Sequence, residues 1–163
     1  DECVIEIEWD EDGSQHMFLN EIDVSEDIRT PEISKIASTV SAHALVRETL
    51  LEMQRDVARR HNVIMDGRDI GTVVLPKATV KIFLTASAEV RARRRTDELI
   101  AKGQKASYDK ILKKIQQRDY QDTHREVAPL KMCRDSIKVD TSDMDIDQVV
   151  AAIKDIVLKK VAK

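Results

Sequence analysis

The chain has 163 residues, enough for one domain with its own core, and its two cysteines, Cys3 and Cys133, exclude a disulfide framework. No apolar run approaches the ~20 residues that a membrane span needs, and the acidic N-terminus argues against a signal peptide, so we expect a soluble, cytoplasmic protein. The net charge of −3 is unevenly distributed: residues 1–27 hold eleven of the 30 acidic groups and none of the 27 basic ones. The basic remainder indicates either ordinary solvated helix faces or an anionic ligand held by arginines.

The first 60 residues predict a small antiparallel sheet followed by two helices. Residues 4–9 alternate apolar and acidic side chains, Asp12-Gly13 is a hairpin turn, and 16–19 is the returning strand. Asn20-Glu21 leads into a short third strand at 22–24. Thr30-Pro31-Glu32 is a helix start, with an N-cap followed by proline at the first helical position, and a second helix is predicted over 43–60.

The remainder alternates short apolar runs with helix-forming sequence. Residues 62–66 and 79–86 predict buried parallel strands, followed by helices at 87–101 and 107–125. A third strand is predicted at 136–141, after which Ser142 or Asp143 caps a last amphipathic helix. Strands that alternate with helices predict an α/β fold with a parallel sheet.

The helix at 107–125 carries an unusual stripe. Ile111 and Ile115 begin an apolar face that continues, at helical spacing, as Arg118, Asp122 and Arg125. The stripe indicates either an ion-pair ladder at a solvated helix end or the wall of a cleft, where the arginines bind phosphate and the carboxylate accepts from a hydroxyl.

The segment VRARRR places Arg91, Arg94 and Arg95 on one helical face. A solvated face and a nucleic-acid patch are alternatives, although only 3% of the residues are aromatic, which disfavours single-strand stacking. A mobile segment that contacts phosphate fits better, with residues 102–104 as its hinge.

Three charged residues, Asp66, Arg68 and Asp69, follow the predicted strand at 62–66. Open α/β sheets bind ligands at the carboxyl ends of their strands. Gly67 and Gly71 bracket a tight loop there, which favours a binding site over a simple turn with a local ion pair. The four histidines show no metal-ligand spacing, and we interpret Cys133 as structural.

Several stretches together resemble bacterial cytidylate kinases. They are MDGRDIGTVVLPKATVKIFLTAS at 65–87, VRARRR at 90–95 and RDYQDTHREVAPL at 118–130, while SEDIRTPEISKIAS at 25–38 is similar to the family's insert. The resemblance implies a P-loop NTPase-like, three-layer α/β fold with a parallel sheet. It also implies transfer of the γ-phosphate of ATP, with Mg²⁺, to CMP or dCMP, giving CDP or dCDP. It predicts no membrane and no specific nucleic acid as partner.

The resemblance assigns the base contacts to three residues. Ser38 and Asp69 match the acceptors for the cytosine amino group, and Arg47 matches the donor to its acceptor side. Uracil presents an oxygen in place of that amino group. This oxygen would face the Asp69 carboxylate, and such an acceptor–acceptor mismatch strongly disfavours binding of UMP.

The sugar, phosphate and metal contacts follow in the same way. Arg118 and Asp122 match ribose contacts, and Arg68 and Arg125 match phosphate contacts. Asp66 matches an aspartate near the magnesium.

The catalytic set implied by the resemblance is arginine-rich. Arg94 and Arg95 match arginines of a lid that closes over the transferring phosphoryl group, and with Arg68 and Arg125 they would stabilise its charge.

One family motif does not occur in these 163 residues. The phosphate-binding loop needs G-x-x-x-x-G-K-[ST], and none of the four glycines begins that pattern. We therefore expect the chain to correspond to the C-terminal two-thirds of such a kinase, with the first strands missing and the exposed edges inviting self-association. The expected organisation is an insert at 1–60 and the remaining kinase core at 61–163, with a lid at about 91–125.

Two other functions stay open at this point. One is a non-catalytic nucleotide-binding fragment, and the other is a basic α/β module that binds nucleic acid or a protein.

Overall fold

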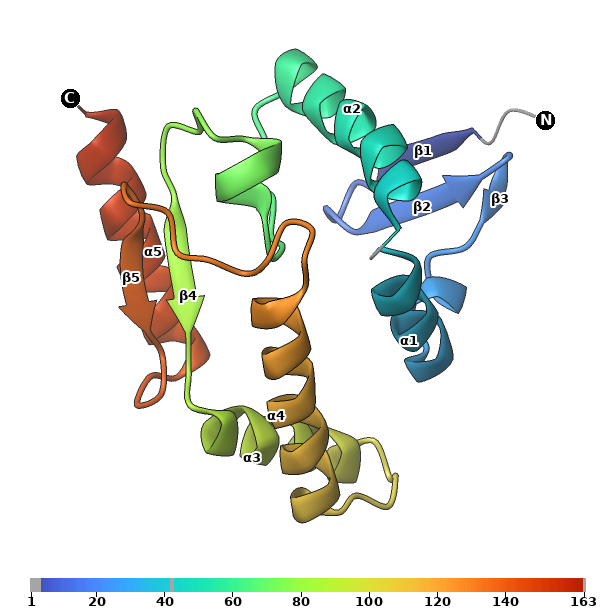
Figure 1. Ribbon diagram of the computed structural model, residues 1–163, viewed down its shortest axis with the longest axis vertical. Helices are drawn as coiled ribbons and strands as arrows, with labels where there is room; N and C mark the ends of the chain where they lie inside the picture. Colours follow the sequence, from blue (N-terminus) through green and yellow to red (C-terminus); the bar gives the residue numbers. More distant parts are fainter. Residues whose placement is uncertain (1–3, 42, 163) are drawn as a thin grey trace. The chain divides into compact units, whose positions relative to one another are not determined.

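The computed structural model describes residues 4–41 and 43–162, without the side chains of residues 31, 34, 35 and 38. The chain forms two compact units, Asp1–Leu50 and Leu51–Lys163, and helix α2 (Ala44–Arg60) belongs partly to each (Figure 1). Each unit is described by itself. The predicted division at residue 60 stays a prediction.

The first unit begins with the predicted antiparallel sheet. Its strands β1 (Ile5–Trp9), β2 (Gln15–Leu19) and β3 (Ile22–Asp23) pair in the order β1-β2-β3. Gly13 has φ +85°, which the turn requires and glycine adopts without strain. A 3₁₀ turn, η1 (Asp27–Arg29), precedes α1 (Pro31–Val40), and the Thr30 hydroxyl accepts from the Ile33 amide at 3.3 Å as the N-cap.

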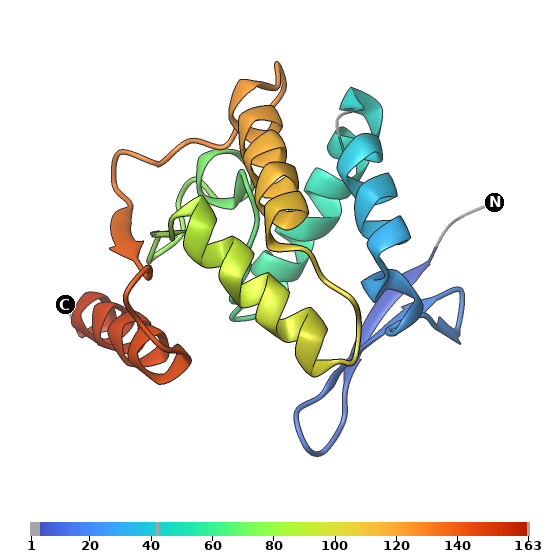
Figure 2. The same ribbon diagram turned by 90° about the horizontal axis from the view of Figure 1, so that it is seen from below.

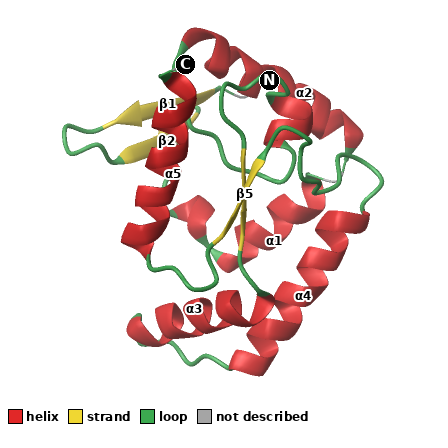
Figure 3. Ribbon diagram, turned by 90° about the vertical axis from the view of Figure 1, so that its left-hand side faces the viewer, coloured by secondary structure: helices red, strands yellow, loops and turns green. Residues whose placement is uncertain are grey.

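The second unit contains a short parallel sheet and three further helices. Strand β4 (Ile82–Thr85) pairs with β5 (Ile137–Asp140), so the predicted α/β class with parallel pairing is confirmed. Helices α3 (Ala88–Ala101) and α4 (Tyr108–His124) connect the two strands and lie side by side (Figures 1 and 2). A π-helical turn, η2 (Ile70–Val74), precedes β4, and α5 (Ile146–Val161) follows β5 (Figure 3).

Two local predictions were wrong. Residues 62–66 form no strand, and Ile64 is fully exposed. An extended segment becomes a strand only when a neighbour exchanges hydrogen bonds with it, and no described strand lies beside this one. The cap of α5 is Asp145, rather than Ser142 or Asp143: its carboxylate accepts from the Gln148 amide at 2.8 Å, and the Gln148 side chain accepts from the Asp145 amide at 3.0 Å.

The apolar core of the described residues is small. Its buried members are Val74, Ala86, Ala92 and Val139, and no large side chain there is fully buried. Larger apolar residues remain exposed, including Leu84 on β4 at 53% and Ile146 on α5 at 81%. Burial of apolar area supplies most of the stability of a fold, so this sheet alone provides little.

Candidate functional site

The loop from Asp66 to η2 is held by its own backbone. The carbonyl of Asp69 accepts from the amides of Val73 (2.8 Å) and Val74 (3.2 Å), and the Asp69 side chain is buried. A Cβ on Gly71 would lie 2.9 Å from the sulfur of Cys133, closer than such atoms approach. A side chain at position 71 would therefore force Cys133 to shift, and the two backbone hydrogen bonds fix Asp69 at the start of the turn.

The Asp122 carboxylate, on α4, contacts arginines from two elements. Its Oδ2 accepts from Nε of Arg68 at 2.9 Å and lies 3.8 Å from Nε of Arg118, one helical turn away. Asp122 is 8% exposed, whereas the side chains of Arg68 and Arg118 are 41% and 55% exposed. The buried carboxylate thus orients two guanidinium groups whose remaining donors stay accessible.

A second ion pair joins the end of α4 to the same loop. Nη2 of Arg125, the C-cap residue, lies 3.8 Å from Oδ1 of Asp69. The guanidinium also donates to the carbonyl of Ala128 through Nε at 2.8 Å and Nη2 at 2.5 Å. The amide of Leu130 donates to the carbonyl of Asp122 at 2.7 Å, which fixes the chain after the helix.

These contacts bring together two segments of the chain that are at least 49 positions apart in sequence. Between them, the segments supply five of the predicted site residues: Arg68, Asp69, Arg118, Asp122 and Arg125. The cluster has three guanidinium groups and two carboxylates. Bidentate guanidinium forks suit phosphate oxygens, and a carboxylate accepts hydrogen bonds from an amino group or a sugar hydroxyl. The arrangement can therefore bind a ligand that combines an anion with hydrogen-bond donors.

The arginines of α3 do not point to a common partner. Arg94 donates to the carbonyls of Thr141 (2.5 Å) and Met144 (3.0 Å), which precede α5, and Arg95 pairs with Glu98 at 2.6 Å on its own helix. Arg94 and Arg95 are thus held near β5 and along α3 respectively, apart from the cluster on α4.

The other predicted contact residues belong to other segments of the chain. Asp66 is exposed, in the segment that was expected to end a strand. Arg47 belongs to the first unit, where Nη1 donates to the carbonyl of Ser41 at 3.2 Å. Ser38 is in α1, and its side chain lies outside the described part of the structure.

Sequence reasoning missed the contacts made by two supporting arginines. Arg55 of α2 donates to the carbonyls of Val74 (Nε, 3.2 Å) and Val73 (Nη2, 3.0 Å) and so secures η2. Arg91 of α3 forms a two-pronged ion pair with Asp119 of α4. Neither partner is near in sequence, so no local pattern could have assigned these contacts.

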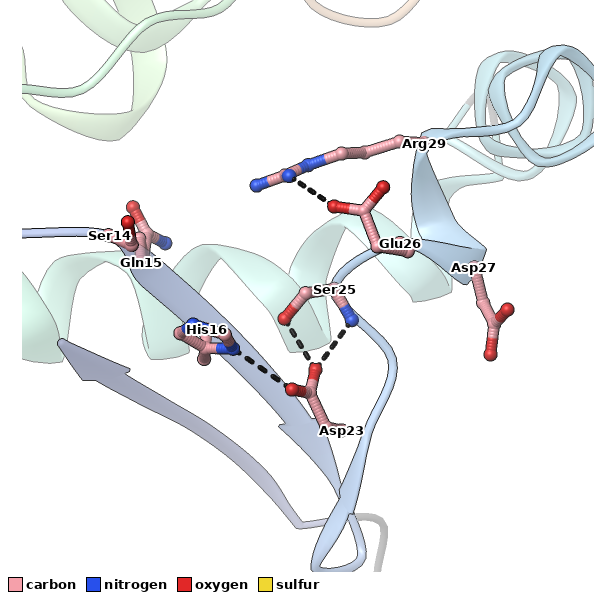
Figure 4. Close-up of a pocket in the computed structure, with 8 residues that line it drawn as sticks. All are labelled: Ser14, Gln15, His16, Asp23, Ser25, Glu26, Asp27 and Arg29. Carbon is pink, nitrogen blue, oxygen red and sulfur yellow. Dashed lines mark hydrogen bonds and ion pairs between the residues drawn. The ribbon is translucent and has the colours of Figure 1, made fainter. Parts of the chain in front are cut away.

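The first unit has a separate, open hollow of about 570 Å³ beside the sheet (Figure 4). It is lined by a polar network in which Nδ1 of His16 lies 2.9 Å from Oδ2 of Asp23, and Asp23 also accepts from the amide (2.8 Å) and hydroxyl (2.5 Å) of Ser25. The hydrogen bonds from Ser25 lower the pKa of Asp23 to about 2, and Asp23 raises the pKa of His16. These polar groups bond to one another within the first unit, which indicates a structural role.

Among the described residues, no three His, Cys, Asp or Glu side chains gather as they would around a metal ion. Within the described ranges, no helix combines the length and apolar character needed to cross a membrane.

Comparison with known proteins adds an independent line of evidence. The family model described as cytidylate kinase matches residues 2–159. A cytidylate kinase of Carboxydothermus hydrogenoformans is 51% identical over 149 residues, which cover 91% of this chain and 67% of that protein. One of Lactobacillus johnsonii is 52% identical over 150 residues, covering 92% of this chain and 65% of that protein. The chain thus spans about two thirds of the length of the curated relatives it matches, and it belongs to the cytidylate kinase family.

Proposed function

We propose that this chain is the acceptor-binding and lid portion of a cytidylate kinase that transfers the γ-phosphate of ATP to CMP or dCMP, giving CDP or dCDP. The observation that carries the proposal is the cluster formed across two distant segments by Arg68, Arg118 and Asp122, with Arg125 beside Asp69. A generic basic module would need no buried carboxylate between its arginines. The family membership supports the same substrate class.

The proposed binding roles follow the chemistry of each group. Arg68 and Arg125 bind the acceptor phosphate, and Arg118 and Asp122 contact the ribose. Asp69 and Ser38 are the proposed acceptors for the cytosine amino group, and Arg47 is the proposed donor to its acceptor side. Asp69 is supported in this role because its carboxylate sits beside a phosphate-binding arginine, where base and phosphate of one nucleotide can be reached together.

Magnesium would bind with the nucleotides. Mg²⁺ keeps several waters and is bound in proteins through one or two carboxylates plus substrate phosphates, so a dedicated cluster of protein ligands is not needed. The exposed carboxylate of Asp66 would lie near the ion and act on it indirectly. The ion would neutralise the charge on the phosphates of ATP.

The proposed lid spans about residues 91–125, with Arg94 and Arg95 closing over the transferring phosphoryl group. Phosphoryl transfer depends on alignment and charge stabilisation, which guanidinium groups supply. Gly103, with φ +71°, lies between α3 and α4 and supports a hinge there.

We further propose a cytoplasmic protein whose three-layer parallel sheet requires strands additional to β4 and β5. Leu84, exposed on β4, and the two-stranded order β4-β5 among the described strands support this, because an open sheet edge leaves backbone groups free to pair. Self-association of the isolated chain is the expected consequence.

These 163 residues alone lack the loop that would bind the phosphates of the donor, ATP. With no G-x-x-x-x-G-K-[ST] in the 163 residues, nothing described would cradle the γ-phosphate of ATP. The chain alone would therefore bind CMP without transferring phosphate. A non-catalytic nucleotide-binding fragment would behave in the same way. Adding a segment that carries the loop distinguishes the two functions, because only a portion of a kinase would then gain turnover.

The test of acceptor binding is a calorimetric titration with CMP. Arg125→Ala should weaken CMP binding by about tenfold or more, since a charge-assisted contact to phosphate is lost. The exposed Arg134 is a matched control, because it has the same charge and lies outside the cluster. Equal affinities of the Arg125→Ala and Arg134→Ala variants would exclude the proposed phosphate contact.

A further inference from the structure

The α3–α4 pair is joined by an ion pair with defined geometry. Arg91, near the start of α3, reaches Asp119, near the end of α4: Nη1 lies 2.9 Å from Oδ1, and Nη2 lies 2.6 Å from Oδ2. Two parallel bonds between a planar fork and a carboxylate fix orientation as well as distance. This contact therefore sets how α4 is rotated against α3.

The same guanidinium also contacts the end of the sheet. Nε of Arg91 donates to the carbonyl of Ala86, the residue that follows β4 after Thr85, at 3.0 Å. Ala86 is buried and so provides a fixed point. A single side chain thus joins the carboxyl end of β4, helix α3 and helix α4.

Asp119 lies among the proposed nucleotide contacts on α4. It is adjacent to Arg118 and three residues before Asp122, whose carboxylate contacts Arg68 across the cluster. Each residue of a helix is offset from the next by about 100°, so a rotation of α4 that displaced Asp119 would also carry Asp122 away from Arg68. The placement of the cluster therefore depends on the Arg91–Asp119 contact.

A second contact holds the other end of α4. Cζ of Arg93 lies 4.8 Å from the centroid of the Tyr108 ring, within the range of a cation–π interaction. The fully buried Ala92 and the buried Thr96 also lie on α3. Loss of Arg91 would leave α4 attached to α3 at its N-terminal end, whereas the end that carries the cluster would lose its link to α3 and β4 and keep its ion pairs with Arg68 and Asp69, so the helix would shift without unfolding.

We propose that Arg91 is a positioning residue for nucleotide binding: through Asp119 and the Ala86 carbonyl, it holds the C-terminal end of α4 in register with the Asp66–Asp69 loop. The inference rests on the proposed function in one respect, that α4 forms the wall of the nucleotide site. Arg91 itself touches no substrate in this account.

The first experiment measures the placement of α4 without any nucleotide. Spin labels are attached at Lys114→Cys on α4 and Lys138→Cys on β5, both exposed positions, after Cys3 and Cys133 are replaced by serine. Arg91→Ala should broaden the distribution of distances between the labels. Lys159→Ala should not, because Lys159 pairs at 2.6 Å with Asp155 on its own helix, α5. An unchanged distribution in Arg91→Ala would overturn the proposal.

The second experiment measures CMP affinity of the chain by calorimetry. Arg91→Ala should weaken binding about tenfold, since displacing a binding group by an ångström is costly. Arg91→Lys should be as weak, because one ammonium cannot hold both carboxylate oxygens and the carbonyl. The double variant Arg91→Ala, Asp119→Ala should bind no more weakly than either single variant.

The outcomes of these two experiments test the positioning role of Arg91 and the proposed function independently. Full affinity in Arg91→Ala, or full rescue by lysine, would overturn the positioning role. If the parent chain binds no CMP, the proposed function fails. The distance measurement then still decides whether Arg91 positions α4.

Discussion

Nε of Arg68 lies 2.9 Å from Oδ2 of Asp122, a contact between a loop and a helix that are 54 residues apart in sequence. The carboxylate is buried and also lies 3.8 Å from Nε of Arg118. One acidic group therefore keeps two cations close together in the absence of any ligand. Such preorganisation reduces the cost of ordering the site when a phosphate binds.

Asp122→Asn tests this arrangement. The amide keeps the size of the side chain but loses the charge that attracts both arginines, so we expect CMP affinity to fall about tenfold. The affinity for cytidine, which lacks the phosphate, should fall less. Calorimetric titration of both ligands gives the two ratios. An equal loss for CMP and cytidine would restrict Asp122 to a ribose contact.

Asp69→Asn tests the reading of the base. An amide can donate to the uracil oxygen as well as accept from the cytosine amino group, so the preference for CMP over UMP should shrink. A correct base contact is worth ~1–3 kcal/mol where side chains read bases. The ratio of the two dissociation constants measures the change. The control is Asp135→Asn, because Asp135 is an exposed carboxylate that pairs with Lys81 at 2.8 Å outside the cluster. If both variants keep the ratio of dissociation constants that the parent chain shows for CMP and UMP, Asp69 does not read the base.

The stability of the first unit should depend on pH through His16 and Asp23. The hydrogen bond that His16 donates to the Asp23 carboxylate raises the pKa of His16 above 6.5, so its contribution to stability is complete below that pH and is lost as the pH rises through the raised value. Ser25 lowers the pKa of Asp23 from 3.8 to about 2, so its contribution is present above pH 3.8 and is lost toward pH 2. The unit should be most stable between about pH 4 and 6.5.

The charged groups around His16 are Asp10, whose Oδ2 lies 3.1 Å from Nε2, Asp23, Asp12 in the hairpin turn, and Glu8, which is opposite on β1. The indole proton of Trp9, the single tryptophan, reports the folded fraction by nuclear magnetic resonance during urea titrations. His16→Gln should remove the loss of stability above pH 6.5, whereas His61→Gln at the end of α2 should not. A profile that both variants leave intact would exclude His16 as its cause.

Leu84→Lys tests the proposed self-association. Leu84 is 53% exposed on β4, a strand whose second edge has no partner among the described strands. A lysine on an open edge opposes strand-to-strand pairing. Sedimentation velocity should show concentration-dependent association of the parent chain and less of it in the variant. A monomeric parent chain with a cooperative thermal transition at high temperature would contradict this prediction.

Local signals predicted most of the elements correctly. Thr30-Pro31 marks the start of α1 and Ser87 caps α3, because capping depends on neighbouring residues. Residues 62–66 were predicted as a strand from their composition, but pairing depends on a neighbour that the sequence of the segment does not encode. Ile64 is exposed for that reason.

The candidate site was likewise predictable only where its contacts lie within one helix. Helical spacing placed Arg118 and Asp122 on one face, and the structure keeps them 3.8 Å apart. The contact of Arg68 with that face comes from tertiary packing. Arg91 and Asp119 are 28 residues apart on different helices, so their pairing has no sequence signature at all.

The central claim is that these residues hold an acceptor site for a cytidine nucleotide without a donor cradle. The most direct measurement titrates the purified chain with CMP and with UMP, and follows ADP release after ATP and Mg²⁺ are added. We expect the chain to bind CMP in preference to UMP and to show no CMP-dependent ADP release. Equal affinity for the two nucleotides, or sustained CMP-dependent ADP release from this chain alone, would contradict it.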